Sequence, residues 1–551
     1  QILPAINGDI WLATENGLGY ISHKNKELVF YQFDPENSNS IKIDAVFSLF
    51  IDKQNDLWIV TEVGIQKLNF ESAFFKTKKV SKQSQGYLRE KDVTAVFVDK
   101  NDNLWLGGAN TGLYQQPRVE HSNATKLLTA HQQNLSSLFH LPSPDIRSFF
   151  EDSQGRYWVG TRYNGVYKIA KNHPSQTLTR THYKKAIVDE YGPVSSNWND
   201  AFFEDSSHTI WLANQKSLFF YDELLDKFVR AKFLNSAGLI DELAIITAFH
   251  QFESNMLVGS SDGDIFYSSE HQATFTQIQI TDSSNIDIEL GDIRAFVATN
   301  DELWIASING LFRGKLQNNS TEGLLKEPKL VVKKWGVEQG LTNGNIYNLF
   351  IDPYSDNILW LNHPKGISKF NVKERKVYHF DELIGYSAKQ FGSRCGFVSN
   401  QGRIYFCGVD GVISFNPQEL QERDELPPTV ILTQLYINNE KIDVNSSATT
   451  LALPLNHSLK ITLYDEQRNF AFDFAALDYT NPEKYQYAYM LEGFDDNWVN
   501  TTAKRRHANY SNIPAGKYIF KVKASNSNGV WNEQGAQIAI IVLPPWYLTW
   551  W

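Results

Sequence analysis

Short apolar runs in which apolar and polar positions alternate recur along most of the 551 residues. Each copy has an apolar run containing Phe, then an Asp, a polar turn, a Leu-Trp-apolar-small-Thr run, and finally a Gly with a second apolar pair. Asp56–Thr61 with Gly64 and Arg156–Thr161 with Gly165 are two such copies. Alternation of apolar and polar residues with a period of two is typical of half-buried strands. The Asp- and Asn-rich stretches between the runs are typical of turns. The pattern therefore predicts antiparallel strands rather than helices.

The repeat is anchored by a large residue at nearly constant spacing. Its nine copies are Trp11, Trp58, Trp105, Trp158, Trp211, Leu257, Trp304, Trp360 and Tyr405. A spacing of about 49 residues fits four short strands, the length of a propeller blade. The spacing predicts a β-propeller region over residues 1–424, N-terminally incomplete because the first copy lacks its opening strand. We interpret the anchors as inter-blade core; a sugar-stacking role for the Trp residues is the alternative.

The repeat ends near residue 424, and strand-like runs of a different kind follow. They cover residues 429–437, 458–463, 470–474, 485–491, 516–524 and 537–542. About seven short strands over this length fit an immunoglobulin-like or fibronectin-like β-sandwich, which we place at 425–545. Tyr485, Tyr487 and Tyr489 alternate onto one strand face, which favours core or interdomain packing over ligand binding. The predicted fold class is all-β.

The blade repeat resembles the two-component regulator propeller repeat of bacterial sensor ectodomains. Residues 391–399 with 402–417 resemble the terminal blade of that family. Large sensors of this type usually carry two seven-bladed rings, whereas nine copies fit neither one ring nor two. The resemblance therefore implies that blades precede residue 1.

The C-terminal motifs resemble the triple-tyrosine (Y_Y_Y) domain that joins such propellers to a transmembrane helix. They are Tyr485–Tyr489, Leu491–Trp498, Tyr510–Gly516 and Asn526–Trp531. In this family order, residues 546–551 are the expected start of a transmembrane segment, with a membrane anchor beyond residue 551.

The resemblance implies the periplasmic ligand-sensing ectodomain of a transmembrane hybrid sensor histidine kinase. Its ligand would be a small molecule or oligosaccharide, and it would form a homodimer through the C-terminal domain. The alternatives are the same ectodomain on a diguanylate cyclase with the GGDEF motif, a propeller enzyme acting on polysaccharides, and a propeller scaffold for protein partners. Fold-level analogy alone does not separate these alternatives.

Composition and motifs narrow the chemistry further. A net charge of -10 argues against a nucleic-acid partner. Nucleophile elbows, phosphate loops and His-Glu-x-x-His motifs are absent from the sequence, so we expect no enzymatic activity, no catalytic residues and no cofactor. Turns such as Asp99–Asn103 lack the Gly and the distal Glu of a calcium loop, and no metal site is expected.

The two cysteines, Cys395 and Cys407, lie on runs that flank a turn at 399–402. A three-residue loop at 400–402 would pair 399 with 403 and 395 with 407, at a separation that allows a disulfide. A one-residue change in the loop removes that pairing. Two small buried thiols are the favoured expectation, and the disulfide is the alternative.

The loops that lead into the innermost strands are the predicted ligand site, because these loops lie on the entrance face of a propeller. They mix Asp, Asn and Arg with one Trp, which suits hydrogen bonding to hydroxyls and stacking on a sugar ring. The predicted ligand-binding residues are Asp44, Asp92, Asp145, Arg147, Trp198, Asn199, Asp292, Arg294 and Asn345. The alternative is that the Asp and Asn residues only cap turns. Trp198 is the strongest single candidate, because it lies outside the blade-core position.

Overall fold

The computed structural model confirms an all-β chain of propeller sheets followed by a β-sandwich. It describes residues 1–5, 8–23, 26, 28–33, 40–52, 56–68, 76–79, 93–108, 112–116, 133–134, 141, 145–162, 164–171, 178–183, 188–189, 192–193, 199–214, 217–240, 244–252, 255–268, 273–299, 302–317, 329–341, 343–380, 391–408, 411–418, 427–442, 454–455, 458, 460–477, 482–526, 529–545 and 547. The chain divides into two compact units, one containing a closed ring of blades and one containing the sandwich.

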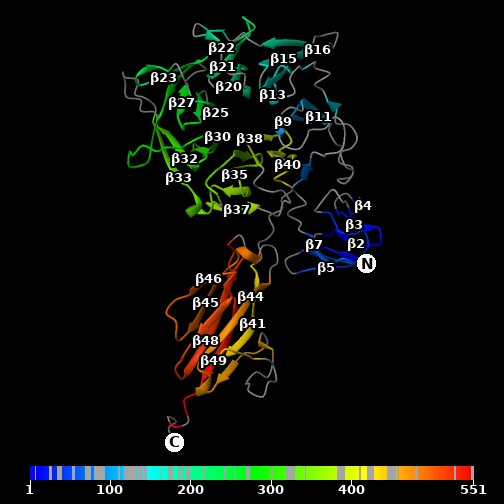
Figure 1. The fold of residues 1–551 in the computed structure, drawn as a ribbon, viewed down its shortest axis with the longest axis vertical. Coiled ribbons are helices and arrows are strands. Elements are labelled where there is room, and N and C mark those ends of the chain that lie inside the picture. Colours follow the sequence, from blue (N-terminus) through cyan, green and yellow to red (C-terminus); the bar gives the residue numbers. More distant parts are fainter. Residues whose placement is uncertain are drawn as a thin grey trace. The chain divides into compact units, whose positions relative to one another are not determined.

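Seven antiparallel sheets form the ring, and Figure 1 shows them arranged around a common centre. The innermost strands are β9 (Val93–Val98), β13 (Ile146–Glu151), β19 (Asn199–Glu204), β25 (Ile246–Phe252), β30 (Ile293–Thr299), β34 (Asn348–Asp352) and β38 (Phe391–Val398). The second strands are β10 (Leu104–Gly108), β14 (Tyr157–Thr161), β20 (Ile210–Asn214), β26 (Asn255–Ser260), β31 (Glu302–Ser307), β35 (Ser355–His363) and β39 (Ile404–Gly408).

The third and outer strands complete each blade. The third strands are β11 (Gly112–Gln116), β15 (Val166–Lys171), β21 (Ser217–Asp222), β27 (Ile265–Ser268), β32 (Gly310–Gln317), β36 (Gly366–Asn371) and β40 (Gly411–Phe415). The outer strands are β12 (Gln133–Asn134), β16 (Leu178–Tyr183), β22 (Lys227–Arg230), β28 (Thr274–Gln277), β33 (Lys329–Trp335), β37 (Lys376–Phe380) and β8 (Lys76–Lys79). Short additions are β17 (Val188–Asp189), β18 (Gly192–Pro193), β23 (Lys232–Asn235), β24 (Gly238–Leu239), β29 (Gln279–Thr281) and the 3-10 turn η1 (Val337–Gln339).

The ring is closed by a strand from its own N-terminal side. β8, which precedes the first blade in sequence, pairs with β40 of the seventh blade, and β38 contacts β9. Gln401 Nε2 also donates to Asp102 Oδ2 across this junction. Seven of the nine repeat copies therefore make one ring.

The first two repeat copies form separate sheets. One contains β1 (Ile2–Pro4), β2 (Ile10–Thr14), β3 (Gly17–Ile21) and β4 (Leu28–Tyr31); the other contains β5 (Val46–Ile51), β6 (Leu57–Thr61) and β7 (Gly64–Leu68). The opening strand β1 is present, because Ile2 pairs with Leu12. The prediction that the first copy lacks it was wrong. This strand is too short and too poor in the repeat's residues to be recognised from the pattern.

An Asp–Trp pair recurs inside the blades. Trp158 Nε1 donates to Asp152 Oδ2 at 2.8 Å, while Asp152 Oδ1 accepts the turn amide of Arg156 at 2.8 Å. The same indole–carboxylate pair joins Trp58 to Asp52, Trp105 to Asp99, Trp211 to Asp205 and Trp360 to Asp352. In the fifth blade Thr299 Oγ1 accepts from Trp304 instead. The predicted turn role of these Asp residues is thus confirmed.

The anchor tryptophans of the ring pack against the following blade, which confirms for them the prediction of an inter-blade core. Trp158 is fully buried, and its ring contacts Phe202, Tyr221 and Phe228 of the third blade. Trp105 stacks on Phe149 of the second blade in the same way. The stacking platform for a sugar is therefore not at these positions.

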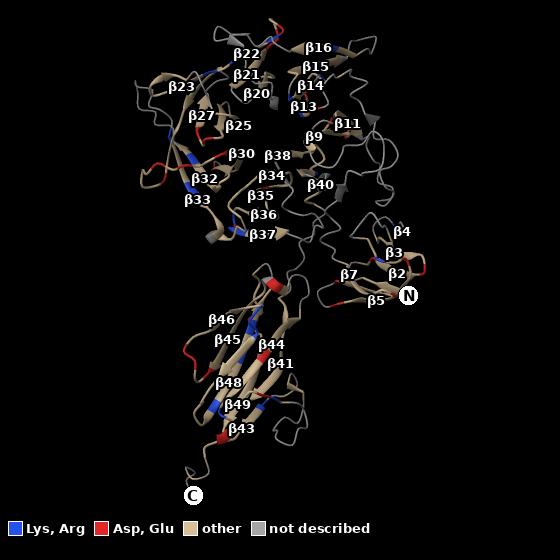
Figure 2. Ribbon diagram, viewed as in Figure 1, with Lys and Arg blue, Asp and Glu red and all other residues tan. Residues whose placement is uncertain are grey.

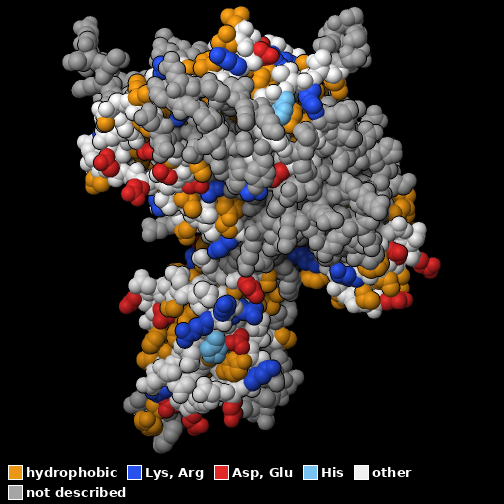
Figure 3. All heavy atoms as spheres, turned by 45° about the horizontal axis from the view of Figure 1, so that its top comes forward, with side chains coloured by type: hydrophobic (Ala, Val, Ile, Leu, Met, Phe, Trp, Pro, Cys, Tyr) orange, Lys and Arg blue, Asp and Glu red, His pale blue; other side chains and the backbone are white. Residues whose placement is uncertain are grey.

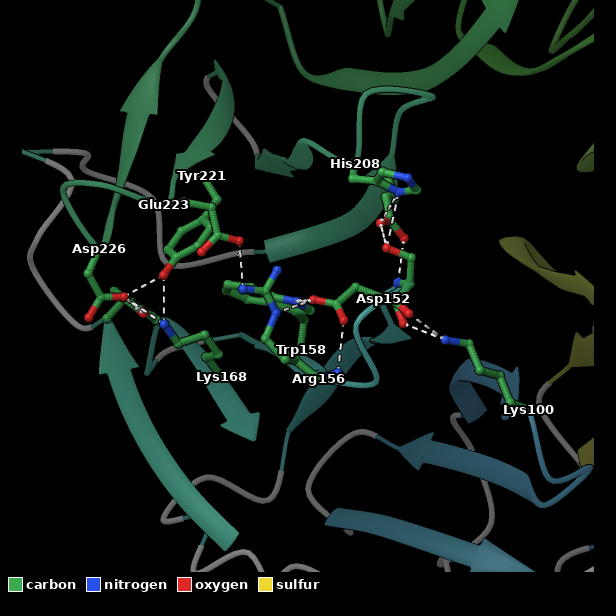
Figure 4. A network of polar contacts seen from close by, with 12 residues as sticks. Lys100, Asp152, Arg156, Trp158, Lys168, His208, Tyr221, Glu223 and Asp226 are labelled. Carbon is green, nitrogen blue, oxygen red and sulfur yellow. Dashed lines mark hydrogen bonds and ion pairs between the residues drawn. The ribbon is translucent and has the colours of Figure 1, made fainter. Parts of the chain in front are cut away.

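Polar side chains join the first three blades at the end of the ring where β13 and β14 turn, as Figure 4 shows. Lys100 Nζ donates to the Asp152 carbonyl, and Arg156 Nη1 donates to Glu223 Oε1. Farther out, Lys168 Nζ lies 2.6 Å from both the Tyr221 hydroxyl and Asp226 Oδ1. This end of the ring is a structural network between blades.

Cys395 and Cys407 form a disulfide between β38 and β39, with a Cα–Cα distance of 5.4 Å. The turn has the form that allows this bond, because Ser399 N donates to the Arg403 carbonyl. The favoured expectation of two thiols was wrong, because the three-residue loop forms and aligns the two positions. The disulfide lies in the blade that closes the ring.

The C-terminal unit is a two-sheet sandwich. One sheet has the order β42 (Glu440–Ile442), β41 (Thr429–Ile437), β44 (Phe470–Leu477) and β47 (His507–Tyr510). The other has the order β43 (Lys460–Leu463), β49 (Ala536–Val542), β48 (Gly516–Ser525), β45 (Gln486–Glu492) and β46 (Val499–Thr502), with 3-10 turns η5 (Asp465–Gln467) and η6 (Pro482–Lys484). The six strand-like runs recognised in the sequence correspond to six of these nine strands, and the other three, β42, β46 and β47, are short and polar.

The three tyrosines lie in or against the sandwich core, as predicted. Tyr485 and Tyr487 are each 1% exposed, and Tyr489 packs against the same cluster. The Tyr487 hydroxyl accepts the Ala476 amide, so its polar end is satisfied inside the core. These residues therefore stabilise the sandwich rather than bind a ligand.

We expect Trp105→Ala to lower the free energy of unfolding of the ring by about 3–5 kcal/mol, because it removes a buried aromatic side chain and leaves a cavity. The matched control is Trp498→Ala in the sandwich, where the side chain is 37% exposed and the loss should be under about 1 kcal/mol. Urea denaturation followed by far-UV circular dichroism measures both. An unchanged midpoint for Trp105→Ala would contradict the inter-blade role.

Asp226 should make a pH-dependent contribution to stability. Hydrogen bonds from Lys168, Tyr183 and Tyr221 lower the pKa of Asp226 to about 2. A carboxyl group whose pKa is lower in the folded than in the unfolded state stabilises the fold at pH values above its unfolded pKa. This contribution is lost as the pH falls toward 2. Because the side chain is 57% exposed, solvent screening limits the effect of Asp226→Asn at pH 7 to about 1 kcal/mol. Denaturation curves between pH 7 and 2 should converge for the two proteins; a difference that persists at pH 2 would argue against the ion pair.

Candidate functional site

The two ends of the ring are built from different loops. In each antiparallel blade, the connection into the innermost strand and the turn between the second and third strands lie at one end. The backbone confirms this, because Arg162 N in the second–third strand turn donates to the Asp145 carbonyl just before β13. Ile308 N donates to the Asp292 carbonyl in the fifth blade. This end, called the entry face here, is opposite to the network in Figure 4.

A β-bulge opens the innermost strand of five consecutive blades at this face. The skipped residues are Thr94, Arg147, Asp200, Thr247 and Arg294, and we call this set the bulge rim. A bulge leaves one residue outside the ladder and re-aims its side chain, and bulges are frequent beside functional sites. All five residues are polar, although the strands that they open are mainly apolar. The bulge rim is therefore the candidate ligand-binding surface.

Buried isoleucines fix the rim on the adjoining blade. Ile146 and Ile293 are fully buried and lie against Gly107 and Gly259 of the preceding blade. A Cβ at Gly107 would lie 2.8 Å from Ile146 Cγ2, so only glycine allows this approach. Because neighbours in the chain point to opposite faces of a strand, burial of the isoleucine places its two flanking residues together on the other side. In the sequence Asp-Ile-Arg, the buried Ile therefore holds the Asp and the Arg together on the opposite side of the strand.

Ion pairs join those flanking residues. In the fifth blade, Arg294 Nη2 lies 2.8 Å from Asp292 Oδ2. In the second blade, Arg147 Nε lies 3.4 Å from Asp145 Oδ1, and Arg162 Nη1 lies 3.6 Å from Asp145 Oδ2. Arg162 was not among the predicted residues. Its signal was its place in the second–third strand turn, which shares the entry face with the predicted loops.

Asn345 precedes the sixth innermost strand and offers an acceptor. Its Oδ1 is buried and accepts no hydrogen bond from any residue that the structure describes, while its amide N binds Asn343 Oδ1. Nearby in the same blade, Asn348 Nδ2 donates to Asn362 Oδ1. The position is suited to accept a hydrogen bond from a ligand hydroxyl.

A chain of hydrogen bonds holds the loop before the sixth blade. Lys365 N donates to His363 Nδ1, which leaves the His363 Nε2–H to donate to Ser368 Oγ. The Ser368 hydroxyl then donates to His379 Nδ1, and His379 Nε2–H donates to the Gly340 carbonyl. With both imidazoles neutral, every donor in this chain has an acceptor. The loop that carries Asn345 is therefore tied to the blade beside it.

The other predicted residues have different outcomes. Asp44 lies outside the ring, in the connection between β4 and β5, where its carboxylate accepts a hydrogen bond from the Phe33 amide at 2.6 Å. Asn199 pairs with Asn214 in the third blade, just as Ile146 pairs with Thr161 in the second blade. Asn199 is therefore the equivalent of the buried Ile146 and not of the loop residue Asp145. Asp92 and Trp198 lie outside the described residues. The structure thus places Asp145, Arg147, Asp292, Arg294 and Asn345 on the entry face of the ring.

Two further predictions from the sequence concern metal binding and a membrane segment. No three His, Cys, Asp or Glu side chains in the described part of the chain are placed to hold one metal ion. None of its helices has the length and apolar character needed to cross a membrane. The predicted start of a transmembrane segment at 546–551 lies, except for Tyr547, outside the described residues.

Known proteins share parts of this architecture. Residues 140–163 match the two component regulator propeller family and residues 478–543 match the Y_Y_Y domain. A histidine kinase from Formosa agariphila, Histidine kinase P4, is 30% identical over 212 residues, which are 38% of this chain and 15% of that relative.

One solved structure supports the fold. The extracellular domain of a hybrid two component system from B. thetaiotaomicron is 21% identical, with a TM-score of 0.68, and the match covers 99% of this chain and 68% of that domain. A second such domain from the same organism is 20% identical over the same shares, with a TM-score of 0.43. The resemblance in the sequence is confirmed: the chain carries the two component regulator propeller followed by the Y_Y_Y domain.

Proposed function

We propose that this chain is the periplasmic ligand-sensing part of a membrane-anchored two-component sensor whose output is a histidine kinase. The supporting observation is the 212-residue similarity to a histidine kinase, together with the order of propeller and Y_Y_Y domain. The propeller binds the ligand, and the sandwich, next in sequence, passes the change on toward the membrane. The chain itself carries out no catalysis.

The ligand is a carbohydrate-like molecule bound at the entry face. The bulge rim and the loops beside it present guanidinium donors from Arg147 and Arg294, and a carbonyl acceptor from Asn345. Sugar hydroxyls donate and accept at once, so such mixed polar sets suit them. Trp198 directly precedes β19 and supplies a ring for stacking in this proposal.

Two chains associate through the C-terminal domain, residues 425–545. A single membrane span carries a signal most simply when two chains change their relation to each other. The sandwich exposes Phe494, Trp498 and Val499 near one edge strand, and Figure 3 shows cationic and apolar side chains together on its surface. Exposed aromatic residues of this kind are enriched in protein interfaces.

The test of sensing uses Arg294→Ala and Trp198→Ala in the full-length receptor. We expect each variant to weaken oligosaccharide binding about tenfold or more, with little change in melting temperature. Ligand-dependent autophosphorylation in membranes should shift to higher ligand concentration by the same factor. Wild-type affinity in both folded variants would move the binding site away from the entry face.

The test of dimerisation uses cysteine crosslinking of the full-length receptor. Single cysteines at Phe494 and Val499 should crosslink between chains, whereas a cysteine at the exposed Leu224 of the ring should not. Ligand should change the crosslinking yield at the sandwich positions. An absence of crosslinks throughout 425–545 would show that another region joins the chains.

A further inference from the structure

The sixth blade continues the bulge rim with an aromatic residue, Tyr347. Relative to the paired residues Asn348 and Asn362, Tyr347 has the place that Arg147 has in the second blade. Its backbone N donates to the Asn362 carbonyl at 2.9 Å, and the preceding Ile346 is fully buried. Tyr347 therefore lies at the entry face, in the position that polar residues occupy in the first five blades.

The fifth blade shows which residues the sixth blade has replaced. There, Asp292 and Arg294 flank the buried Ile293 and form an ion pair at 2.8 Å. In the sixth blade the flanking residues are Asn345 and Tyr347, whose uncharged side chains cannot form that ion pair. Asn345 Oδ1 is buried and accepts no hydrogen bond from any residue that the structure describes. The double replacement therefore leaves a hydrogen-bond acceptor open at the entry face.

The first residue pair of β34 and β35 differs from its equivalents as well. In the sixth blade this pair is Asn348 and Asn362, and Asn348 Nδ2 donates to Asn362 Oδ1 at 3.0 Å. Asn362 is fully buried, and its own Nδ2 donates to no residue in the described part of the chain. In the first five blades the pair consists of small residues, Ala95–Gly107, Ser148–Gly160, Ala201–Ala213, Ala248–Gly259 and Ala295–Ala306. The sixth blade thus adds an open donor to the open acceptor.

The open acceptor and the open donor lie on the same side of the sixth blade. Ile346 packs against the fifth blade, so its neighbours Asn345 and Tyr347 are directed toward the seventh. Asn362 is directed the same way, because it lies two residues after Trp360, whose ring contacts the seventh blade. Tyr347 also packs against the buried cluster of these two blades and remains partly exposed. An aromatic ring, an acceptor and a donor are therefore gathered at one end of one sheet face.

We propose that Tyr347, Asn345 and Asn362 form a sugar subsite of the entry face, with Tyr347 as the stacking surface. A buried donor and a buried acceptor without partners are unfavourable, and hydroxyl groups of a sugar, which donate and accept, satisfy both. The apolar face of the sugar ring stacks on Tyr347.

This inference rests on the proposed carbohydrate-sensing function, and it specifies that the ligand contains a sugar unit with free hydroxyls, held here by uncharged groups. The two amide atoms are covered in the unliganded chain. The sugar therefore displaces the side chains that cover them, and it enters beside Tyr347, the partly exposed member of the set.

The experiment measures binding of oligosaccharides to the whole chain by calorimetry. The probes are a panel of neutral and acidic oligosaccharides built from hexose, pentose and 6-deoxyhexose units. For a member that binds, Tyr347→Ala should lower the affinity about tenfold or more, whereas Tyr347→Phe, which keeps the ring, should bind within about threefold of wild type. The matched control is Tyr354→Ala, which removes a tyrosine at the other end of the same blade and should bind within about twofold of wild type.

Asn345→Ala separates a binding role from a structural one. It removes a buried acceptor that has no partner among the described residues, so the melting temperature of the unliganded chain should stay the same or rise. The affinity should nevertheless fall about tenfold or more, because the sugar hydroxyl loses its acceptor. The double variant Asn345→Asp with Tyr347→Arg copies the Asp292–Arg294 pair of the fifth blade, and it should fold and show a similar loss of affinity.

The outcomes separate the two proposals. Wild-type affinity of folded Tyr347→Ala or of folded Asn345→Ala would overturn the subsite, and so would a lower melting temperature of Asn345→Ala without a loss of affinity. Carbohydrate sensing at the entry face would then stand if Arg294→Ala binds more weakly than wild type. Binding of no member of the panel would overturn both proposals. Melting temperatures of all variants show that they are folded.

Discussion

The propeller depends on the hydrogen bond between a buried indole and a buried carboxylate. The anchor tryptophan of a blade fills the gap to the next blade, and its N–H would lose an acceptor there. An Asp at the start of the preceding turn supplies that acceptor with one oxygen and caps the turn with the other, as Asp152 does for Trp158 and Arg156. One Asp therefore accepts the buried indole N–H and also caps the turn, which explains why the pair recurs in four of the seven blades of the ring.

Closure of the ring requires contacts between parts far apart in sequence. β8 completes the seventh blade, and Gln401 reaches Asp102, so the first and last blades hold each other. The Cys395–Cys407 disulfide lies in this same blade and links its two inner strands. A cross-link limits the conformations of the unfolded chain, so it stabilises the closing blade in particular.

The two ends of the ring have different roles. The end shown in Figure 4 joins the blades through Lys100, Arg156 and Lys168, which bind Asp152, Glu223 and Asp226 of the next blade. At the entry face, bulges release one polar residue per blade from the ladder in five blades. Charges are spread over both units in Figure 2, so local geometry rather than net charge distinguishes the entry face.

The sequence by itself determined the blade repeat, the turn role of residues such as Asp152, the tyrosine-rich core of the sandwich and the loops before the inner strands. These follow from local periodicity and turn chemistry, which act over a few residues. Only the tertiary structure decided that seven of nine copies close one ring, because closure depends on a strand pair between residues 76–79 and 411–414. It also brought Arg162 to Asp145, because the two loops meet only when the strands of the blade are paired in register.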